Sequence, residues 1–291
     1  MFFGSIPALV TPFTGGRVAE DTFREFIEWQ IAEGSNGLVP CGTTGEVATL
    51  TSDEHRHVVA TTVEAAKGRV PVIAGAGTCD TAASIERARA AADVGADAVL
   101  VVVPYYNRPS QAGLAAHFTA IADASPLPIV VYNVPARTVA DISVETLATI
   151  ARHPKIVAVK DATGNLGRVS AQRLACGEGF CQLSGNDDMA LGFNAMGGVG
   201  CVSVTANVAP KLCSDFQKAM REGRWDDALK LQDRLYPLHA ALFTDASPAP
   251  TKYALTRVRS GFPAELRLPL VEPSDASKRA VDAALAHAGL I

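Results

Sequence analysis

A lysine and a tyrosine each stand at the end of an apolar stretch, and together they could perform carbonyl chemistry. Lys160 follows Ile-Val-Ala-Val at residues 156–159, where a charged ammonium is costly without a partner. Loss of water around the amine favours its neutral form, which attacks a carbonyl to form an imine, or Schiff base. Tyr132 ends the preceding apolar stretch, and its hydroxyl could donate and accept protons at the imine carbon.

The sequence leaves simpler interpretations of both residues open. Lys160 could be paired with Asp161 or Glu46 for structural reasons. Tyr132 could be a core tyrosine whose hydroxyl bonds to a backbone carbonyl. A catalytic interpretation therefore depends on which residues surround this pair.

Three further residues could bind carboxylates. Thr43 and Thr44 lie in a glycine-rich turn at residues 42–45, whose exposed amides can hold an anion. Arg137 offers a planar fork of donors suited to a second carboxylate. The alternatives are an ordinary tight turn and a surface arginine in a loose ion pair.

These residues need a scaffold that brings distant segments together. Short β-branched and apolar stretches recur along the chain, each followed by an amphipathic stretch. We predict strands at residues 6–10, 37–41, 71–74, 98–103, 128–132, 156–160, 182–184 and 199–204. Eight alternations favour an α/β fold, the (β/α)8 TIM barrel, over an open doubly wound sheet. In such a barrel the active site lies at the carboxyl ends of the strands.

Helix signals support this pattern and extend beyond it. Residues 52–54 and 80–81 and Ser143 are typical of helix starts, and Gly95 is typical of a helix end. After the eighth strand we predict only helices, at residues 211–221, 225–243, 251–259 and 275–288. The sequence therefore predicts a barrel catalytic domain over residues 1–222 and a C-terminal helical extension over residues 223–291, packed on the barrel.

Composition excludes several classes of protein. The 291 residues are 48% hydrophobic and 19% charged, with a net charge of −4 and no cluster of Lys and Arg, so we expect no nucleic-acid partner. The N-terminus has no basic region, and the longest apolar run, residues 98–104, is too short to cross a bilayer. We expect no membrane association and a cytoplasmic location. The six cysteines lack CxxC spacing, and no nucleotide-binding glycine loop is present, so we expect no metal or organic cofactor.

Five motifs in order resemble the dihydrodipicolinate synthase family, whose members are also called 4-hydroxy-tetrahydrodipicolinate synthases. The motifs are GTTGE at residues 42–46, PYYNRPSQ at 104–111, YNVPART at 132–138, VKDATG at 159–164 and SVTANVAP at 203–210. The similarity runs from GSIPALVTPF near the start to ALAHAGL near the end. It implies a class I aldolase-type lyase that condenses pyruvate with L-aspartate 4-semialdehyde, the first committed step towards diaminopimelate and lysine.

The resemblance also implies a role for individual residues. Lys160 matches the imine-forming lysine, and Tyr132 matches the tyrosine that relays protons to the imine and the aldehyde oxygen. Thr43 matches the middle of a hydroxyl relay. Thr44, together with Thr43, matches the turn that holds the pyruvate carboxylate. Arg137 matches the arginine at the entrance that receives the carboxylate of the semialdehyde.

Other matching positions concern the pocket wall and the assembly. Tyr106 matches the phenol that a neighbouring subunit inserts to complete the relay, and Gly185 and Val202 match positions that line the pocket with main chain. The implied assembly is a homotetramer built as a dimer of dimers. Asp161 stands where many relatives have Glu, which is a mild departure.

Two other functions remain possible from the sequence. N-acetylneuraminate lyase and 2-keto-3-deoxy sugar acid aldolases share the imine lysine and the tyrosine. The second threonine, the phenol of PYYN and Arg137 favour the synthase branch. A catalytically inactive barrel that only binds a ligand would be expected to have lost Lys160 or Tyr132, and both are present.

The resemblance also bears on regulation. In lysine-inhibited members, a histidine, an asparagine and a glutamate beside a tyrosine hold L-lysine at the dimer interface. This chain has Ser52, Cys79 and Ala83 at the matching positions, while His55 and Tyr105 remain. Because Ala83 cannot pair with the ammonium group, we expect weak or absent feedback by L-lysine. A nearby carboxylate could take over this role.

Overall fold

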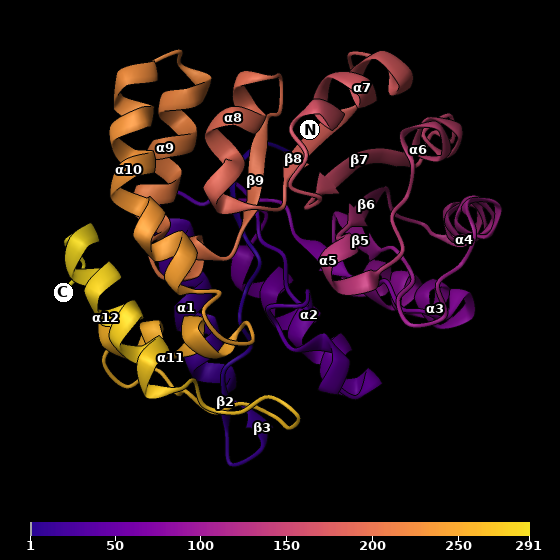
Figure 1. Ribbon diagram of the computed structural model, residues 1–291. Helices are drawn as coiled ribbons and strands as arrows, with labels where there is room; N and C mark the ends of the chain where they lie inside the picture. The colour runs from indigo at the N-terminus through magenta and orange to yellow at the C-terminus, as the bar shows by residue number, and fades with distance from the viewer. Residues whose placement is uncertain (1) are drawn as a thin grey trace.

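The computed structural model describes residues 2–291 and contains one curled parallel sheet surrounded by helices (Figure 1). Its seven strands are hydrogen-bonded in the order β1-β9-β8-β7-β6-β5-β4. Their bounds are Gly4–Pro7 (β1), Ile73–Gly75 (β4), Ala98–Val102 (β5), Ile129–Asn133 (β6), Ile156–Asp161 (β7), Cys181–Ser184 (β8) and Gly200–Ser203 (β9). Each coincides with one of the predicted strands to within a few residues.

The predicted strand at residues 37–41 closes this sheet into a barrel between β1 and β4. It forms two isolated parallel bridges, from Ala8 to Val39 and from Leu38 to Val72. The ladder is short because Pro40 has no N–H to donate and Cys41 has a left-handed backbone with φ of 54°. The predicted (β/α)8 barrel is confirmed, with its second strand reduced to these bridges.

Two apolar layers explain why the strands are apolar on both faces. One cluster fills the barrel and includes Ile6, Val39, Leu100, Val130 and Leu183. A larger cluster lies between the outer face of the sheet and the helices. Side chains alternate between these layers along each strand, so a strand's outward residues pack under helices while its inward residues face the barrel interior.

Three barrel helices begin where the sequence predicts helix starts, namely α2 (Ser52–Ala66), α3 (Thr81–Asp93) and α6 (Val144–Ile150). Thr51 caps α2 in a reciprocal capping box with Glu54, and the side chains of Asp80 and Ser143 cap α3 and α6. The helices are α1 (Glu20–Ala32), α2 (Ser52–Ala66), α3 (Thr81–Asp93), α4 (Gln111–Ala124), α5 (Pro135–Thr138), α6 (Val144–Ile150), α7 (Gly167–Cys176), α8 (Ala190–Ala195) and α9 (Pro210–Arg221). Short 3₁₀ turns lie at Val47–Thr49 (η1), Asp187–Met189 (η2) and Thr205–Asn207 (η3).

The C-terminal extension consists of α10 (Trp225–Ala241), α11 (Ala249–Val258) and α12 (Asp275–Ala288). Figure 1 shows these helices against one side of the barrel, where α10 packs on α9 and α12. The predicted helical extension is thus present, with ends that differ by up to two residues. The division of the chain at residue 222 stays a prediction.

The sequence analysis missed one element. A small antiparallel hairpin, β2 (Phe13–Thr14) and β3 (Arg17–Val18), follows β1 around two glycines with positive φ, Gly15 and Gly16. Its strands of two residues are too short to give an alternating pattern. The hairpin contacts the extension, because both glycine N–H groups donate to Glu265.

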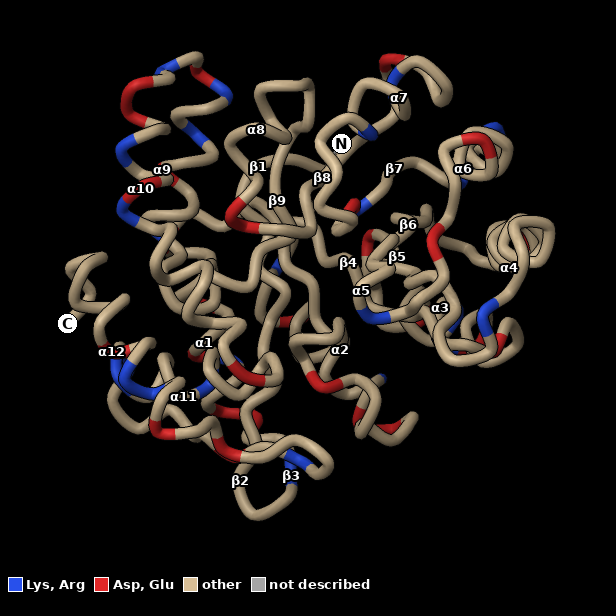
Figure 2. Tube along the Cα trace, viewed as in Figure 1, with Lys and Arg blue, Asp and Glu red and all other residues tan. Residues whose placement is uncertain are grey.

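Charge is spread over the outside of the barrel. In Figure 2, acidic and basic residues alternate along the outer helices rather than forming one basic face. Across residues 2–291, no helix combines the length and the apolar character needed to span a membrane.

Candidate active site

Lys160 and Tyr132 lie side by side inside the barrel. They are direct register partners on the neighbouring strands β7 and β6, and both side chains share the inward face with Ala158 and Val130. The Lys160 Nζ lies 3.9 Å from the centre of the Tyr132 ring. Both residues are buried, with 6% and 7% of their surface exposed. An amine and a phenol that are this close together and shielded from solvent can exchange protons at one reacting carbon.

The structural pairing considered for Lys160 is absent, because both candidate carboxylates bind other groups. Asp161 points away from the barrel interior and accepts from Arg168 at 3.1 Å and from Gln172 at 2.7 Å. Glu46 is paired with Lys252 at 2.5 Å. Among the described residues, the Lys160 amine therefore forms no ion pair and stays available for chemistry.

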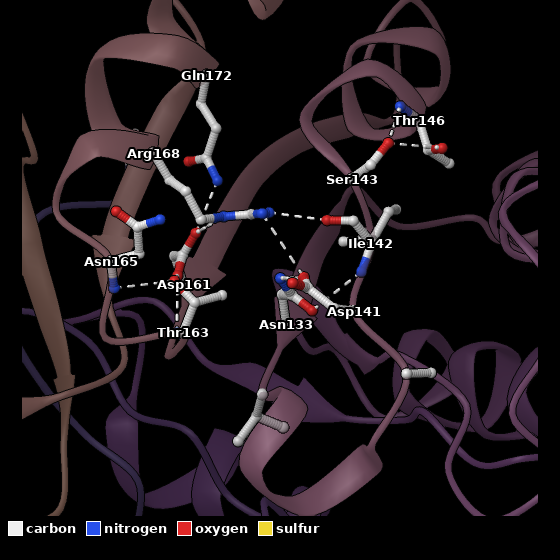
Figure 3. Close-up of polar contacts among 12 residues, drawn as sticks. Asn133, Asp141, Ile142, Ser143, Thr146, Asp161, Thr163, Asn165, Arg168 and Gln172 are labelled. Carbon is white, nitrogen blue, oxygen red and sulfur yellow. Dashed lines mark hydrogen bonds and ion pairs between the residues drawn. The ribbon is translucent and has the colours of Figure 1, made fainter.

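A polar network fixes the ends of β6 and β7 directly behind this pair (Figure 3). Asn133 and Asp161, the residues after Tyr132 and Lys160, are register partners that face outwards. Arg168 on α7 joins Asp161 to Asp141, because its Nε donates to Asp161 and its guanidinium lies 3.6 Å from the Asp141 carboxylate.

Asn133 is tied into the same network through Asp141 and Ile142. Asn133 Nδ2 donates to Asp141 at 2.7 Å, and its Oδ1 accepts from the N–H of Ile142 at 3.3 Å. Arg168 also donates to the Ile142 carbonyl at 2.8 Å. The network ties both strand ends to the segment before α6, so it resists any shift of the inward pair.

The glycine-rich turn after the second strand lies at the mouth of the barrel. Its backbone closes on the carbonyl of Gly42, which accepts from the N–H groups of Gly45 and Val47. Thr43 is exposed and Thr44 is buried. Glycine is required at Gly45, because an added Cβ would lie 2.9 Å from the backbone oxygen of Leu9. The tight packing of this turn sets the positions of the two threonine hydroxyls.

A pocket of about 400 Å³ opens at the carboxyl ends of the strands. Thr43 and Arg137 line it, together with Val102, which is the register partner of Tyr132. The pocket therefore extends outwards from the level of the Lys160–Tyr132 pair, which lies deeper and is not part of the lining. Arg87 of α3 and Tyr105 also line it. The pocket holds two arginines, whereas its acidic lining residue, Glu46, is neutralised by Lys252.

The remaining predicted residues lie at different depths. Val202 is buried within the barrel, and Gly185 follows β8 where an added Cβ would lie 2.7 Å from the Cβ of Ala162. Tyr106 is 93% exposed, with a positive φ of 68°, so its ring does not reach the pair within its own chain. The chain thus brings Lys160 and Tyr132 together but leaves Tyr106 apart.

Four cysteines are buried, namely Cys41, Cys181, Cys201 and Cys213. Burial raises the pKa of the thiols of Cys41, Cys201 and Cys213, which disfavours a thiolate nucleophile. Within residues 2–291, no three His, Cys, Asp or Glu side chains gather in a way that could hold a metal ion.

Sequence reasoning missed several residues that surround the site. Arg168 and Lys252 are joined to it only by contacts between distant segments, whereas Asn133 directly follows Tyr132. A polar residue directly after each reacting residue was the available signal, because alternation along a strand turns its side chain outwards.

A parallel (β/α)8 barrel with a buried amine beside a phenol at the carboxyl ends of its strands has the architecture of an aldolase-type enzyme. Comparison with known proteins narrows this class. The sequence model of the Dihydrodipicolinate synthetase family matches residues 1–288. The chain belongs to this family.

The relatives cover the whole chain. A 4-hydroxy-tetrahydrodipicolinate synthase of Rhizorhabdus wittichii is 66% identical and one of Zymomonas mobilis is also 66% identical, each over 100% of both chains. Among solved structures, a chloride-inhibited dihydrodipicolinate synthase of Acinetobacter baumannii, complexed with pyruvate, is 39% identical with a TM-score of 0.97 over 100% of both chains.

Proposed function

We propose that this protein is a 4-hydroxy-tetrahydrodipicolinate synthase that condenses pyruvate with L-aspartate 4-semialdehyde through an imine on Lys160. The observation that carries this proposal is the buried, unpaired Lys160 amine lying 3.9 Å from the centre of the Tyr132 ring, at the carboxyl ends of the barrel strands. The names of full-length relatives at 66% identity support the choice of reaction.

The chemistry follows from the two side chains. The neutral Lys160 amine adds to the ketone of pyruvate and water leaves, so that a C=N bond replaces the C=O bond. The protonated imine withdraws electrons, and a methyl proton is lost to give an enamine. The enamine carbon attacks the aldehyde carbon, and Tyr132 donates a proton to the oxygen that forms. A phenol in this position contributes on the order of 10²- to 10⁴-fold to the rate.

The final step releases the enzyme. The amino group of the condensed product attacks the imine carbon, a ring closes, and Lys160 leaves as the free amine. Water is produced when the first imine forms, and protons are exchanged through Tyr132. These steps need no metal or organic cofactor.

The two substrate carboxylates have separate candidate partners. The turn that carries Thr43 and Thr44 offers hydroxyls and backbone N–H groups to the carboxylate of pyruvate. Arg137 lines the outer pocket and is suited to the carboxylate of the semialdehyde. Gly185 and Val202 complete the inner wall with main chain.

The assembly is part of this proposal. Tyr106 is 93% exposed and cannot complete a relay with Tyr132 and Thr43 in its own chain, which supports its insertion into a neighbouring subunit. We propose a homotetramer built as a dimer of dimers, acting in the cytoplasm.

We further propose weak regulation by L-lysine. Ala83 has no polar side chain, and Asp80 is already engaged because its carboxylate caps α3 by accepting from the N–H groups of Ala82 and Ala83. Arg87 and Tyr105 line the neighbouring pocket. A second cation there would be repelled by the Arg87 guanidinium, and Ala83 offers it no charged partner.

Borohydride trapping tests the central proposal. Incubation with pyruvate and borohydride should add one reduced pyruvyl group, and the modified peptide should contain Lys160. Lys155, the residue before β7, provides a matched control, because its amine donates to the Ser125 carbonyl. Lys155→Arg should still be labelled, whereas Lys160→Arg should not. Label on another lysine would refute the assignment to Lys160, and absence of any label would refute the Schiff-base mechanism.

An assay with competing substrates tests the reaction itself. The protein should consume pyruvate with L-aspartate 4-semialdehyde and should release little pyruvate from N-acetylneuraminate or 2-keto-3-deoxy sugar acids. Faster cleavage of either acid than synthesis would place it in another branch of pyruvate lyases.

A further inference from the structure

A buried ion pair joins the C-terminal extension to the glycine-rich turn. Lys252 of α11 and Glu46, the residue that follows the turn, have fully buried side chains, and their Nζ and Oε1 atoms lie 2.5 Å apart. The mechanism proposed above uses neither residue. Their pairing connects two segments that are far apart in the sequence.

Each member of the pair is held by additional contacts. Glu46 Oε2 accepts from the backbone N–H of Arg267 at 3.1 Å, and Lys252 Nζ donates to the carbonyl of Glu265 at 2.7 Å. The Lys252 Nζ also lies 4.3 Å from the centre of the Phe13 ring. Removing two charges from water is costly, and an apolar pair of similar volume often stabilises a fold equally well. Stability alone is therefore a weak reason for these two charges, and a specific orientation is a stronger one.

The orientation that this pair fixes is that of the glycine-rich turn at residues 42–45. Glu46 has a left-handed backbone, with φ of 55°. A residue other than glycine adopts this conformation only when its surroundings hold it there. Its N–H donates to the carbonyl of Thr43 at 3.1 Å. A carboxylate fixed by Lys252 thus fixes the backbone on which Thr43 and Thr44 stand.

The extension also forms part of the pocket wall. Ser247, Pro269 and Leu270 line the same pocket as Thr43 and Glu46. Arg267 strengthens the attachment, because its guanidinium donates to the Thr49 carbonyl at 2.9 Å and to Glu54. The segment from α11 to residue 270 therefore touches the turn, the 3₁₀ turn η1 and the start of α2.

We propose that Lys252 is a positioning residue of the active site, which acts through Glu46 to hold the Thr43–Thr44 turn in the orientation that binds the carboxylate of pyruvate. This inference rests on the proposed function. The C-terminal extension is then required for substrate binding as well as for covering the barrel.

Pyruvate affinity, measured by calorimetric titration and by the pyruvate dependence of borohydride labelling, tests this role. Lys252→Met keeps the length of the side chain but removes its charge. We expect half-saturation by pyruvate to rise about tenfold or more, whereas kcat at saturating pyruvate falls by less than about threefold.

A double variant separates positioning from stability. Lys252→Met alone leaves a buried, unpaired carboxylate and should lower the melting temperature. Glu46→Gln combined with Lys252→Met removes that charge, so the melting temperature should recover while the half-saturation by pyruvate stays raised. Arg257→Met is the matched control on α11, because it loses only a half-exposed pair with Asp282. It should leave both quantities unchanged.

The outcomes discriminate clearly. Half-saturation equal to that of the wild type in Lys252→Met, or in the double variant if the single variant does not fold, would overturn the positioning role. Absence of label on Lys160 in the wild type would refute the proposed imine alone. The calorimetric titration with pyruvate would still decide the role of Lys252 in that case.

Discussion

Replacing Arg168 should weaken both the fold and catalysis, because this residue links the strand ends that carry Tyr132 and Lys160. In Arg168→Met, Asp161 loses a charged donor at 3.1 Å, which is worth about 1.5–3 kcal/mol, and the Ile142 carbonyl loses a donor at 2.8 Å, which is worth about 0.5–1.5 kcal/mol. The contact with Asp141 adds little, because that carboxylate is 47% exposed.

The combined loss is about 2–4 kcal/mol in the free energy of unfolding. It stays at the low end of the cost of an unpaired buried charge, because Asp161 still accepts from Gln172 and from the N–H and hydroxyl of Thr163. At roughly 2–4 °C per kcal/mol for a chain of this size, the melting temperature should fall by about 4–16 °C.

Catalysis should change as well. A small displacement of reacting groups can cost up to about 100-fold in rate, so we expect kcat to fall roughly tenfold in Arg168→Met at a temperature well below the melting point. Arg168→Lys should recover little, because an ammonium cannot span Asp161 and Ile142 as the planar fork does.

Calorimetry and steady-state kinetics on the same samples check both parts. Arg173→Met is a suitable control, because Arg173 lies on α7 but donates to the Met196 carbonyl instead. It should lower the melting temperature without lowering kcat. A melting temperature equal to that of the wild type in Arg168→Met would refute the energetic reasoning, and an unchanged kcat would refute the link to the reacting pair.

Three further predictions concern the assembly, regulation and pH. Tyr106→Phe should lower kcat about tenfold or more, and mixing it with Lys160→Ala subunits should restore part of the activity; no recovery in verified mixed dimers would show that each chain works alone. L-Lysine should inhibit weakly because Ala83 cannot pair with its ammonium, and half-inhibition below 1 mM, roughly −4 kcal/mol of binding, would contradict this. Burial lowers the pKa of His117 to about 4 from 6.5, so as the pH falls from 6.5 to 4 the unfolded chain binds a proton that the folded chain excludes, and stability falls by about 3 kcal/mol. In denaturant unfolding, His117→Gln should lose this part of the pH dependence.

Local patterns in the sequence were sufficient to predict most of the fold. Apolar stretches indicated the strands, and Asp80 and Ser143 indicated helix starts, because a capping side chain bonds to N–H groups only two or three residues away. The strand at residues 37–41 was also predicted, although its ladder is only two bridges. The hairpin around Gly15 was missed because two-residue strands carry no periodic signal.

The location of Lys160 and Tyr132 could be predicted for the same reason. Lys160 and Tyr132 each end an apolar strand, and the carboxyl ends of parallel strands in a barrel meet on one side. The sequence alone therefore places both residues on the same face of the barrel. Their separation of 3.9 Å depends on the register of β6 against β7, which pairs Tyr132 with Lys160 directly.

The sequence alone could not predict which residues pair with the buried charges. Asp161 and Glu46 were both plausible partners of Lys160, yet Asp161 binds Arg168 and Glu46 binds Lys252. The sequence alone determined which residues lie on the barrel's reactive face, because strand alternation and parallel topology are local or repeated rules. Only the tertiary structure decided which charges neutralise one another, because a buried charge takes the partner that the packing of distant segments brings within a few ångströms.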